Sequence, residues 1–318
     1  MKRFQWKWVF AAPAIALAAI SCETPDPTDD PSSSYPSDDL VVDGTQNLGL
    51  TEITAVTCPD CPVRQEVMEI LKARYPGRII PMSLHADTLF TQTAADIYLT
   101  LGDDQSNPFK LFINGTQVAS DPFELVDAVI QADAPPVVGV AHATREIDTA
   151  WVIYPKVEIY ADNQRDLFIQ SYILMDNVVA KQYGDIDLTQ LSNDPRLQQG
   201  GGGAPTTWTT AAGEVDSVTN LYAQGDAYMH HDVLLYGGVN DTTAYGIPLS
   251  LVNPLGQNYF AGDIFGNQYT PMEIYVPKPD FNIIGHVSGE IKVVTIVWER
   301  FEATPPVFTY LNGYYSEF

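Results

Sequence analysis

The sequence predicts an α/β domain over residues 45–133 and an all-β domain over residues 136–318, the second folded as an antiparallel β-sandwich. In the first part, apolar stretches of strand length alternate with segments of helical apolar spacing. In the second part, short β-like runs are separated by Gly, Pro and Asn breaks at sandwich-like spacing. Pro135-Pro136 marks the boundary between the two parts.

The first domain is expected to contain strands at 48–56, 78–84, 109–113 and 117–119, and helices at 63–75, 91–101 and 122–132. Val67, Ile70 and Leu71 show the apolar spacing of a helix. Asn114-Gly115 predicts a two-residue hairpin turn between the last two strands. Asp121-Pro122 suits the start of the last helix, because proline fits the first helical turn.

The second domain is expected to consist of short strands at 137–143, 151–161, 167–175, 215–223, 228–236, 246–252, 272–276, 291–298 and 307–310. Partial alternation of apolar and polar residues is visible at 157–160 and 168–172. Residues 194–213 include Gly200–Gly203 and are predicted to form an exposed loop.

Residues 1–22 have the features of a secretion signal. Lys2 and Arg3 precede the apolar run Trp8–Ile20, which is too short for a stable membrane span. The Ala-Ile-Ser-Cys sequence at 19–22 resembles a relaxed bacterial lipobox, which implies cleavage before Cys22 and lipid attachment to it. The alternative is ordinary cleavage nearby with a free Cys22.

Residues 23–44 are rich in Pro, Asp, Ser and Thr, and are predicted to form a disordered acidic tether. The net charge of the chain is −24, which argues against nucleic acid and anionic membrane surfaces as partners. Membrane contact is therefore expected through lipid alone, and no cofactor motif is present in the chain.

Cys58 and Cys61 form a C-x-x-C pair between an apolar stretch and a helical segment. This strand–turn–helix context favours a redox motif over half of a zinc site, which would need further ligands. His230 and His231 cannot both ligate one ion from a regular strand, because adjacent residues face opposite ways. The other histidines, His85, His142 and His286, are scattered, so no metal site is expected.

The first domain resembles a thioredoxin fold, on the strength of C-P-D-C followed by Asn107-Pro108 and an Asn-Gly hairpin. The resemblance implies that Pro108 is cis and faces the disulfide, and that Glu52, six residues before Cys58, is a buried acid that handles the proton of the second cysteine. The alternative is a solvent-facing Glu52. Two departures from the thioredoxin pattern, Thr57 before the pair and Asp60 within it, put catalytic efficiency in doubt.

A redox role assigns different tasks to the two thiols. Cys58 is expected at a helix N-terminus, where free backbone N–H groups and the helix dipole stabilise its thiolate. Cys61 is expected to be shielded and to resolve a mixed disulfide. In an oxidising compartment, however, an unreactive structural disulfide would also persist.

The chain as a whole resembles the outer membrane protein 28-like lipoproteins, through the sequence from Glu52 to Pro62, the segments 172–182 and 228–235, and the late strand 293–298. This resemblance implies a Gram-negative outer-membrane lipoprotein, facing the periplasm or the cell surface. We expect either a thiol–disulfide oxidoreductase acting on protein disulfides, or a non-enzymatic surface lipoprotein whose β-sandwich binds a protein or glycan.

Overall fold

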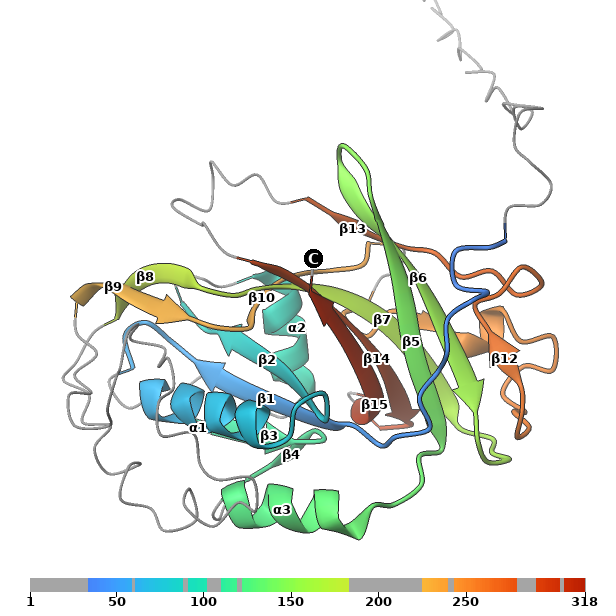
Figure 1. Ribbon diagram of the computed structural model, residues 1–318, viewed down its shortest axis with the longest axis horizontal. Helices are drawn as coiled ribbons and strands as arrows, with labels where there is room; N and C mark the ends of the chain where they lie inside the picture. The colour runs from blue at the N-terminus through green and yellow to red at the C-terminus, as the bar shows by residue number, and fades with distance from the viewer. Residues whose placement is uncertain are drawn as a thin grey trace, which may run out of the picture. The chain divides into compact units, whose positions relative to one another are not determined.

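The computed structural model describes residues 34–58, 61–87, 91–101, 110–118, 122–182, 225–239, 243–278, 290–303 and 306–317 (Figure 1). The first part of the chain forms β1 (Leu48–Thr54), α1 (Cys61–Arg74), β2 (Ile79–His85), α2 (Gln92–Thr100), β3 (Lys110–Ile113), β4 (Thr116–Gln117) and α3 (Pro122–Ala132). The expected alternation of strands and helices is confirmed here, with bounds that differ by a few residues. Asn114 and Gly115 both have positive φ angles, of 50° and 81°, as the β3–β4 hairpin turn requires.

The second part of the chain is β-rich. It forms β5 (Val138–Glu146), β6 (Ala150–Ile159), β7 (Asp166–Met175), β8 (Val178–Gln182), β9 (Gly225–His230), β10 (Val233–Gly237), β11 (Ile247–Pro248), the 3-10 helix η1 (Leu249–Leu251), β12 (Ile264–Phe265), β13 (Ile274–Pro277), β14 (Ile291–Phe301) and β15 (Val307–Glu317). An α/β part followed by a β-rich part is thus confirmed.

A nine-stranded mixed sheet contains strands from both parts, in the order β15-β14-β7-β10-β2-β1-β3-β4, with β11 also paired to β7. β1 and β2 are parallel, and β3 and β4 continue the sheet as antiparallel strands. On the other side of β2, Val233 of β10 pairs with Ser83. The large sheet contains strands that precede Pro135-Pro136 and strands that follow it. A boundary between two domains at Pro135-Pro136 therefore stays a prediction.

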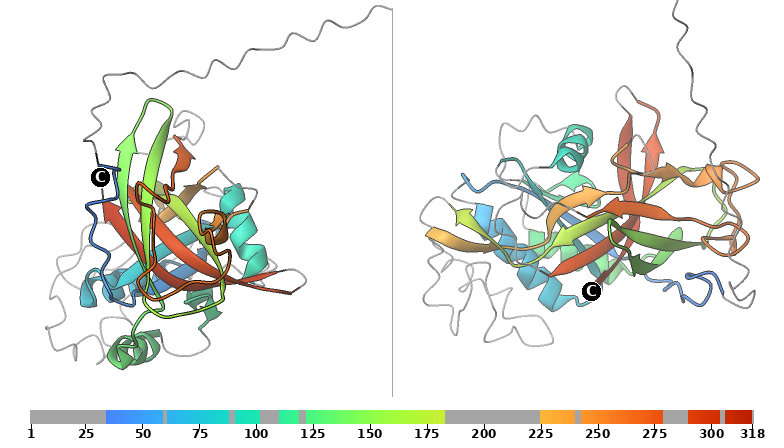
Figure 2. Two further views of the ribbon diagram at one scale, coloured as in Figure 1. Left: turned by 90° about the vertical axis from the view of Figure 1, so that its right-hand side faces the viewer. Right: turned by 90° about the horizontal axis from the view of Figure 1, so that it is seen from above.

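A second sheet covers one face of the β-rich half. Its order is β12-β6-β13, and β5 pairs with β6 (Figure 2). Val140 and Val157 of this sheet share an apolar cluster with Leu167, Ile169 and Val297 of the large sheet. β8 and β9 form a separate two-stranded ribbon.

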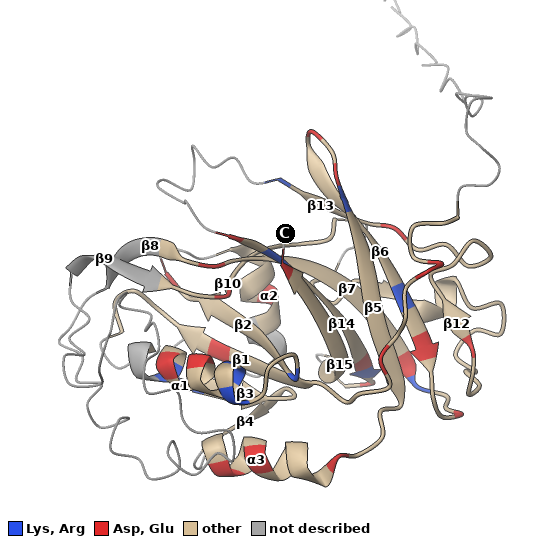
Figure 3. Ribbon diagram, in the orientation of Figure 1, with Lys and Arg blue, Asp and Glu red and all other residues tan. Residues whose placement is uncertain are grey.

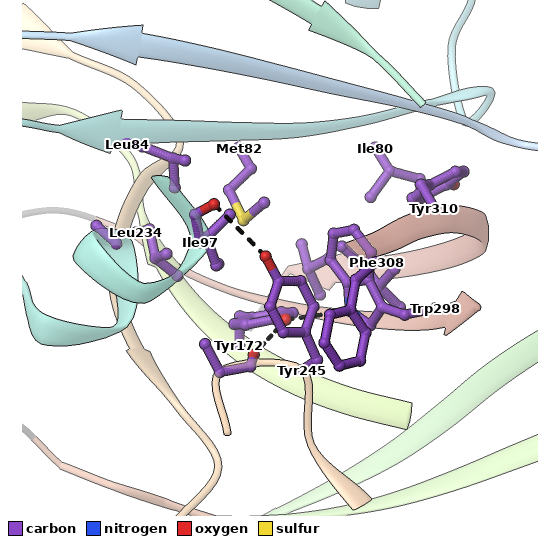
Figure 4. Packing of buried hydrophobic residues seen from close by; sticks show 14 of the residues in the cluster. Ile80, Met82, Leu84, Ile97, Tyr172, Leu234, Tyr245, Trp298, Phe308 and Tyr310 are labelled. Carbon is purple, nitrogen blue, oxygen red and sulfur yellow. Dashed lines mark hydrogen bonds between the residues drawn. The ribbon is translucent and has the colours of Figure 1, made fainter. Parts of the chain in front are cut away.

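Helices cover the β1–β3 half of the large sheet on both faces. α1 and α3 pack on the face that carries Leu48 and Leu50. α2 packs on the opposite face, over an aromatic core in which Tyr172 donates a hydrogen bond to the backbone oxygen of Ala244 and accepts one from Trp298 Nε1 (Figure 4). Within the described ranges, no helix is long and apolar enough to span a membrane.

Two expectations in the β-rich part differ from the structure. The expected strand 228–236 is two strands, because the chain bends at His231-Asp232, where Asp232 has a φ of 52°. The expected strand 246–252 is β11 followed by η1, since an apolar run of this length does not distinguish a strand from a helical turn. The loop at 194–213 and the strand at 215–223 lie outside the described residues.

The N-terminal segment 34–44 is held against the protein, in contrast to the predicted disorder of 23–44. Tyr35 OH donates to the backbone oxygen of Met272 at 2.7 Å, and Ser37 is fully buried. Lys156 Nζ donates to the backbone oxygens of Asp38 and Leu40 at 2.7 and 2.8 Å. These hydrogen bonds and the edge-to-face contact of Tyr35 with Tyr154 hold the segment, and composition did not reveal them. Residues 23–33 lie outside the described residues.

Candidate functional site around Cys58 and Cys61

The C-x-x-C pair lies where β1 gives way to α1, as the sequence predicted. A disulfide bond joins Cys58 and Cys61, and α1 begins at Cys61. Cys58 N–H donates to the backbone oxygen of Ala55, and Cys61 N–H donates to that of Cys58, so a turn brings the two residues together. Cys58 is 9% exposed and Cys61 is 1% exposed, which makes Cys58 the sulfur that another molecule reaches more easily.

Glu52 is fully buried, on the face of β1 that carries Leu48 and Leu50 beneath α1. The alternative of a solvent-facing Glu52 is therefore wrong. Ser83 Oγ donates to its Oε1 at 2.7 Å, and its Oε2 has no hydrogen-bond partner among the described residues. Burial raises the pKa of Glu52 to about 8, against the lowering effect of the Ser83 hydrogen bond, so the side chain carries a proton at neutral pH.

Asp87, just beyond β2, holds the segment that leads into the cysteine pair. Its Oδ2 accepts hydrogen bonds from the backbone N–H and the hydroxyl of Thr57, at 3.0 and 3.1 Å. Ala86, the residue before Asp87, packs against the two cysteines. A carboxylate thus lies beside the residue that precedes Cys58, and like charges oppose thiolate formation.

His85 and His230 form a buried ring pair at the same end of the sheet. Their ring centroids are 4.9 Å apart in an edge-to-face arrangement. Burial lowers the pKa of His85 to about 3 and that of His230 well below its usual value, so both rings are neutral at physiological pH. Both ring nitrogens of His85 are buried, and no hydrogen-bond partner for them lies in the part of the chain that the structure describes.

A network of buried charges lies next to this pair and ties α1 to the β-rich part. Asp232 accepts hydrogen bonds from Lys72 Nζ at 2.6 Å and Lys292 Nζ at 3.0 Å. Asp176 contacts Lys292 at 2.7 Å and His231 Nδ1 at 2.7 Å. Burial opposes ionisation of Asp176, but the His231 hydrogen bond and the Lys292 charge outweigh it, so the pKa of Asp176 lies well below its usual range.

The other predicted site residues are placed as follows. Pro108 and Cys22 lie outside the described residues. Within the described ranges, no group of three or more His, Cys, Asp or Glu side chains is arranged to hold a metal ion. His230 contacts His85 and His231 contacts Asp176, so these two neighbours have different partners.

Sequence reasoning missed Ser83, His85, Asp87 and the contribution of His230 to this site. Ser83 lies opposite Glu52 in the β1–β2 register, which the parallel pairing of the two expected strands could have suggested. His230 reaches His85 because β10 joins the sheet beside β2, and no local sequence signal indicates that pairing.

Comparisons with known proteins add a likeness in fold. The structure of HBP35 of Porphyromonas gingivalis is similar to this one, with a TM-score of 0.50 and 12% sequence identity, over 87% of this chain and 76% of that one. No protein-family model matches the chain, and no curated protein matches it in sequence. At this level of identity the likeness concerns the fold alone.

Proposed function

We propose that the chain is a lipid-anchored thiol–disulfide oxidoreductase of the outer membrane, with a thioredoxin-like domain and a β-sandwich domain. The observation that carries the proposal is the Cys58–Cys61 disulfide at the start of α1, above a buried and protonated Glu52. The resemblance to the outer membrane protein 28-like lipoproteins supports the location, with lipid on Cys22 as the anchor.

The reaction begins with the reduced pair. The Cys58 thiolate attacks one sulfur of a substrate disulfide, which forms a mixed disulfide and releases the other substrate sulfur as a thiolate. The Cys61 thiolate then attacks the Cys58 sulfur, which releases the second substrate thiol and leaves the Cys58–Cys61 disulfide. Two electrons pass to the substrate, and an external dithiol returns two electrons to the pair.

Two features of the site suit these steps. The positive end of the α1 helix dipole, beside the disulfide, favours negative charge on Cys58. Glu52 has a pKa of about 8, so it exchanges a proton in the pH range in which thiols ionise, and we assign it the proton of Cys61. The proposal also assigns Pro108 to the presentation of the substrate backbone.

A structural disulfide is the second candidate, and the low exposure of Cys58 favours it. The Asp87 carboxylate beside Thr57 favours it too, because it opposes formation of the Cys58 thiolate. In this case the protein is a surface lipoprotein that binds a protein or glycan through its β-rich part.

Trapping of the mixed disulfide separates the two candidates. The full mature chain with Cys61→Ser is incubated, reduced, with a disulfide-containing protein, and the covalent adduct is measured on non-reducing gels. We expect an adduct with Cys61→Ser and none with Cys58→Ser. Absence of the adduct with Cys61→Ser contradicts the oxidoreductase proposal. Labelling of Cys22 with radioactive palmitate in cells tests the anchor separately.

A further inference from the structure

Five large apolar side chains are exposed in the stretch between β11 and β13, which contains η1, β12 and the loops around them: Leu251, Leu255, Phe260, Ile264 and Tyr269. We name residues 249–270 the β6-end loops. The exposed fraction reaches 73% for Leu251 and 83% for Tyr269. Single apolar residues are common on protein surfaces, but a group of them marks an interaction site.

The β6-end loops are all held at one place, the C-terminal end of β6 and the residues just after it. Three hydrogen bonds attach them there: Gln164 Nε2 to Asn258 Oδ1 at 3.0 Å, Ala261 N–H to Asp162 Oδ1 at 2.8 Å, and Gly262 N–H to the backbone oxygen of Ile159 at 2.8 Å. Ile264 pairs with Glu158 on β6 itself. The β6-end loops therefore lie at one end of the second sheet, around β12 in Figure 1.

The N-terminal segment is attached beside the same loops. Ser37 Oγ donates to the backbone oxygen of Gly266 at 2.5 Å, and Gln268 N–H donates to Asp38 Oδ1 at 3.0 Å. Cys22 precedes Ser34 by twelve residues. A chain of that length spans about 40 Å at full extension. A lipid on Cys22 would therefore leave the β6-end loops within reach of the membrane surface.

We propose that the β6-end loops dock on the bilayer that holds the lipid anchor, with their apolar side chains in the interfacial region. This inference rests on the anchor of the proposed function. The occupant is a zwitterionic phospholipid surface, because acidic residues that contact the loops or lie in them repel anionic headgroups: Asp38, Glu158, Asp162 and Asp263. Acidic segments are drawn in red around β12 and the end of β6 in Figure 3. The membrane contact thus extends beyond the lipid that the sequence predicted as the sole contact.

Hydrogen exchange on vesicles tests the docking. The full mature chain, with an N-terminal histidine tag in place of Cys22, is tethered to phosphatidylcholine vesicles through a nickel-chelating lipid. This tether does not depend on natural acylation. We expect exchange across 249–270 to slow about tenfold relative to the free protein, and to slow less on phosphatidylglycerol vesicles.

Two triple variants separate docking from general adhesion. Leu251→Ser, Leu255→Ser and Tyr269→Ser together should abolish the slowing, whereas Leu125→Ser, Val239→Ser and Phe301→Ser, at apolar side chains exposed elsewhere, should preserve it. Unchanged exchange in the parent protein on vesicles overturns the proposal, as does slowing that persists in the first variant. Absence of palmitate on Cys22 in cells contradicts the lipid anchor of the proposed function. That result is separate from the vesicle experiment, which does not use the natural anchor.

Discussion

Glu52→Gln replaces a buried acid with a neutral side chain of the same shape, and so isolates the cost of ionising Glu52. The glutamine oxygen can still accept the hydrogen bond from Ser83 Oγ. The new amide N–H2 replaces Oε2, for which the described residues of the parent protein provide no hydrogen-bond partner. The two proteins therefore differ mainly in whether position 52 can acquire a charge.

The magnitude follows from the pKa of Glu52, which burial raises from 4.5 to about 8. Between these values the unfolded state has released the proton and the folded state has not, so the unfolded state binds fewer protons. The free energy of unfolding therefore falls as pH rises, by about 1.4 kcal/mol for each pH unit. The loss reaches about 3 kcal/mol at pH 7 and about 5 kcal/mol above pH 8. Glutamine does not titrate, so Glu52→Gln escapes this loss.

Urea denaturation at pH 5, 7 and 8.5 measures the difference. We expect the two proteins to have similar stability at pH 5, and Glu52→Gln to be more stable by about 3 kcal/mol at pH 7. Glu302→Gln serves as the control, because the Glu302 side chain is 94% exposed and the substitution should change little at any pH. A stability difference between Glu52→Gln and the parent protein that does not vary with pH refutes the reasoning.

Two further substitutions test the surroundings of the cysteine pair. Asp87→Asn keeps an acceptor for Thr57 but removes a negative charge, so the pKa of the reduced Cys58 thiol should fall, as measured from the pH dependence of alkylation. An unchanged profile shows that the charge does not reach Cys58. Lys292→Met removes the cation that Asp176 and Asp232 share, and should lower the free energy of unfolding, measured in urea, by about 3 kcal/mol. Lys278→Met removes a more exposed ion pair and should lower it by less than about 1 kcal/mol. Equal losses of stability in Lys292→Met and Lys278→Met would contradict the expectation that the buried ion pairs stabilise the fold more than the exposed one.

Local sequence signals predicted the part of the site that depends on neighbouring residues. The apolar run before Cys58, the helical spacing after it and the Asn114-Gly115 turn each act over a few residues, and the corresponding elements are present. The burial of Glu52 was implied only by the resemblance to thioredoxin, and the residue pattern left a solvent-facing Glu52 open, which the structure excludes.

The remainder of the site depends on pairing between distant strands, which local patterns do not encode. β10 joins β2 across about 150 residues of sequence, and this pairing places His230 beside His85. The bend at Asp232 also depends on contacts with residues far away in the sequence. An aspartate with positive φ and full burial is costly in isolation, and it is stable here because Lys72 and Lys292 neutralise it.

The reduction potential of the Cys58–Cys61 disulfide tests the proposed activity most directly. It is measured by equilibrating the full mature chain in glutathione and dithiol buffers and quantifying the free thiols. The proposal predicts a value between about −270 and −120 mV, the range of catalytic dithiols. A value below about −300 mV is that of a structural disulfide and would contradict the oxidoreductase proposal.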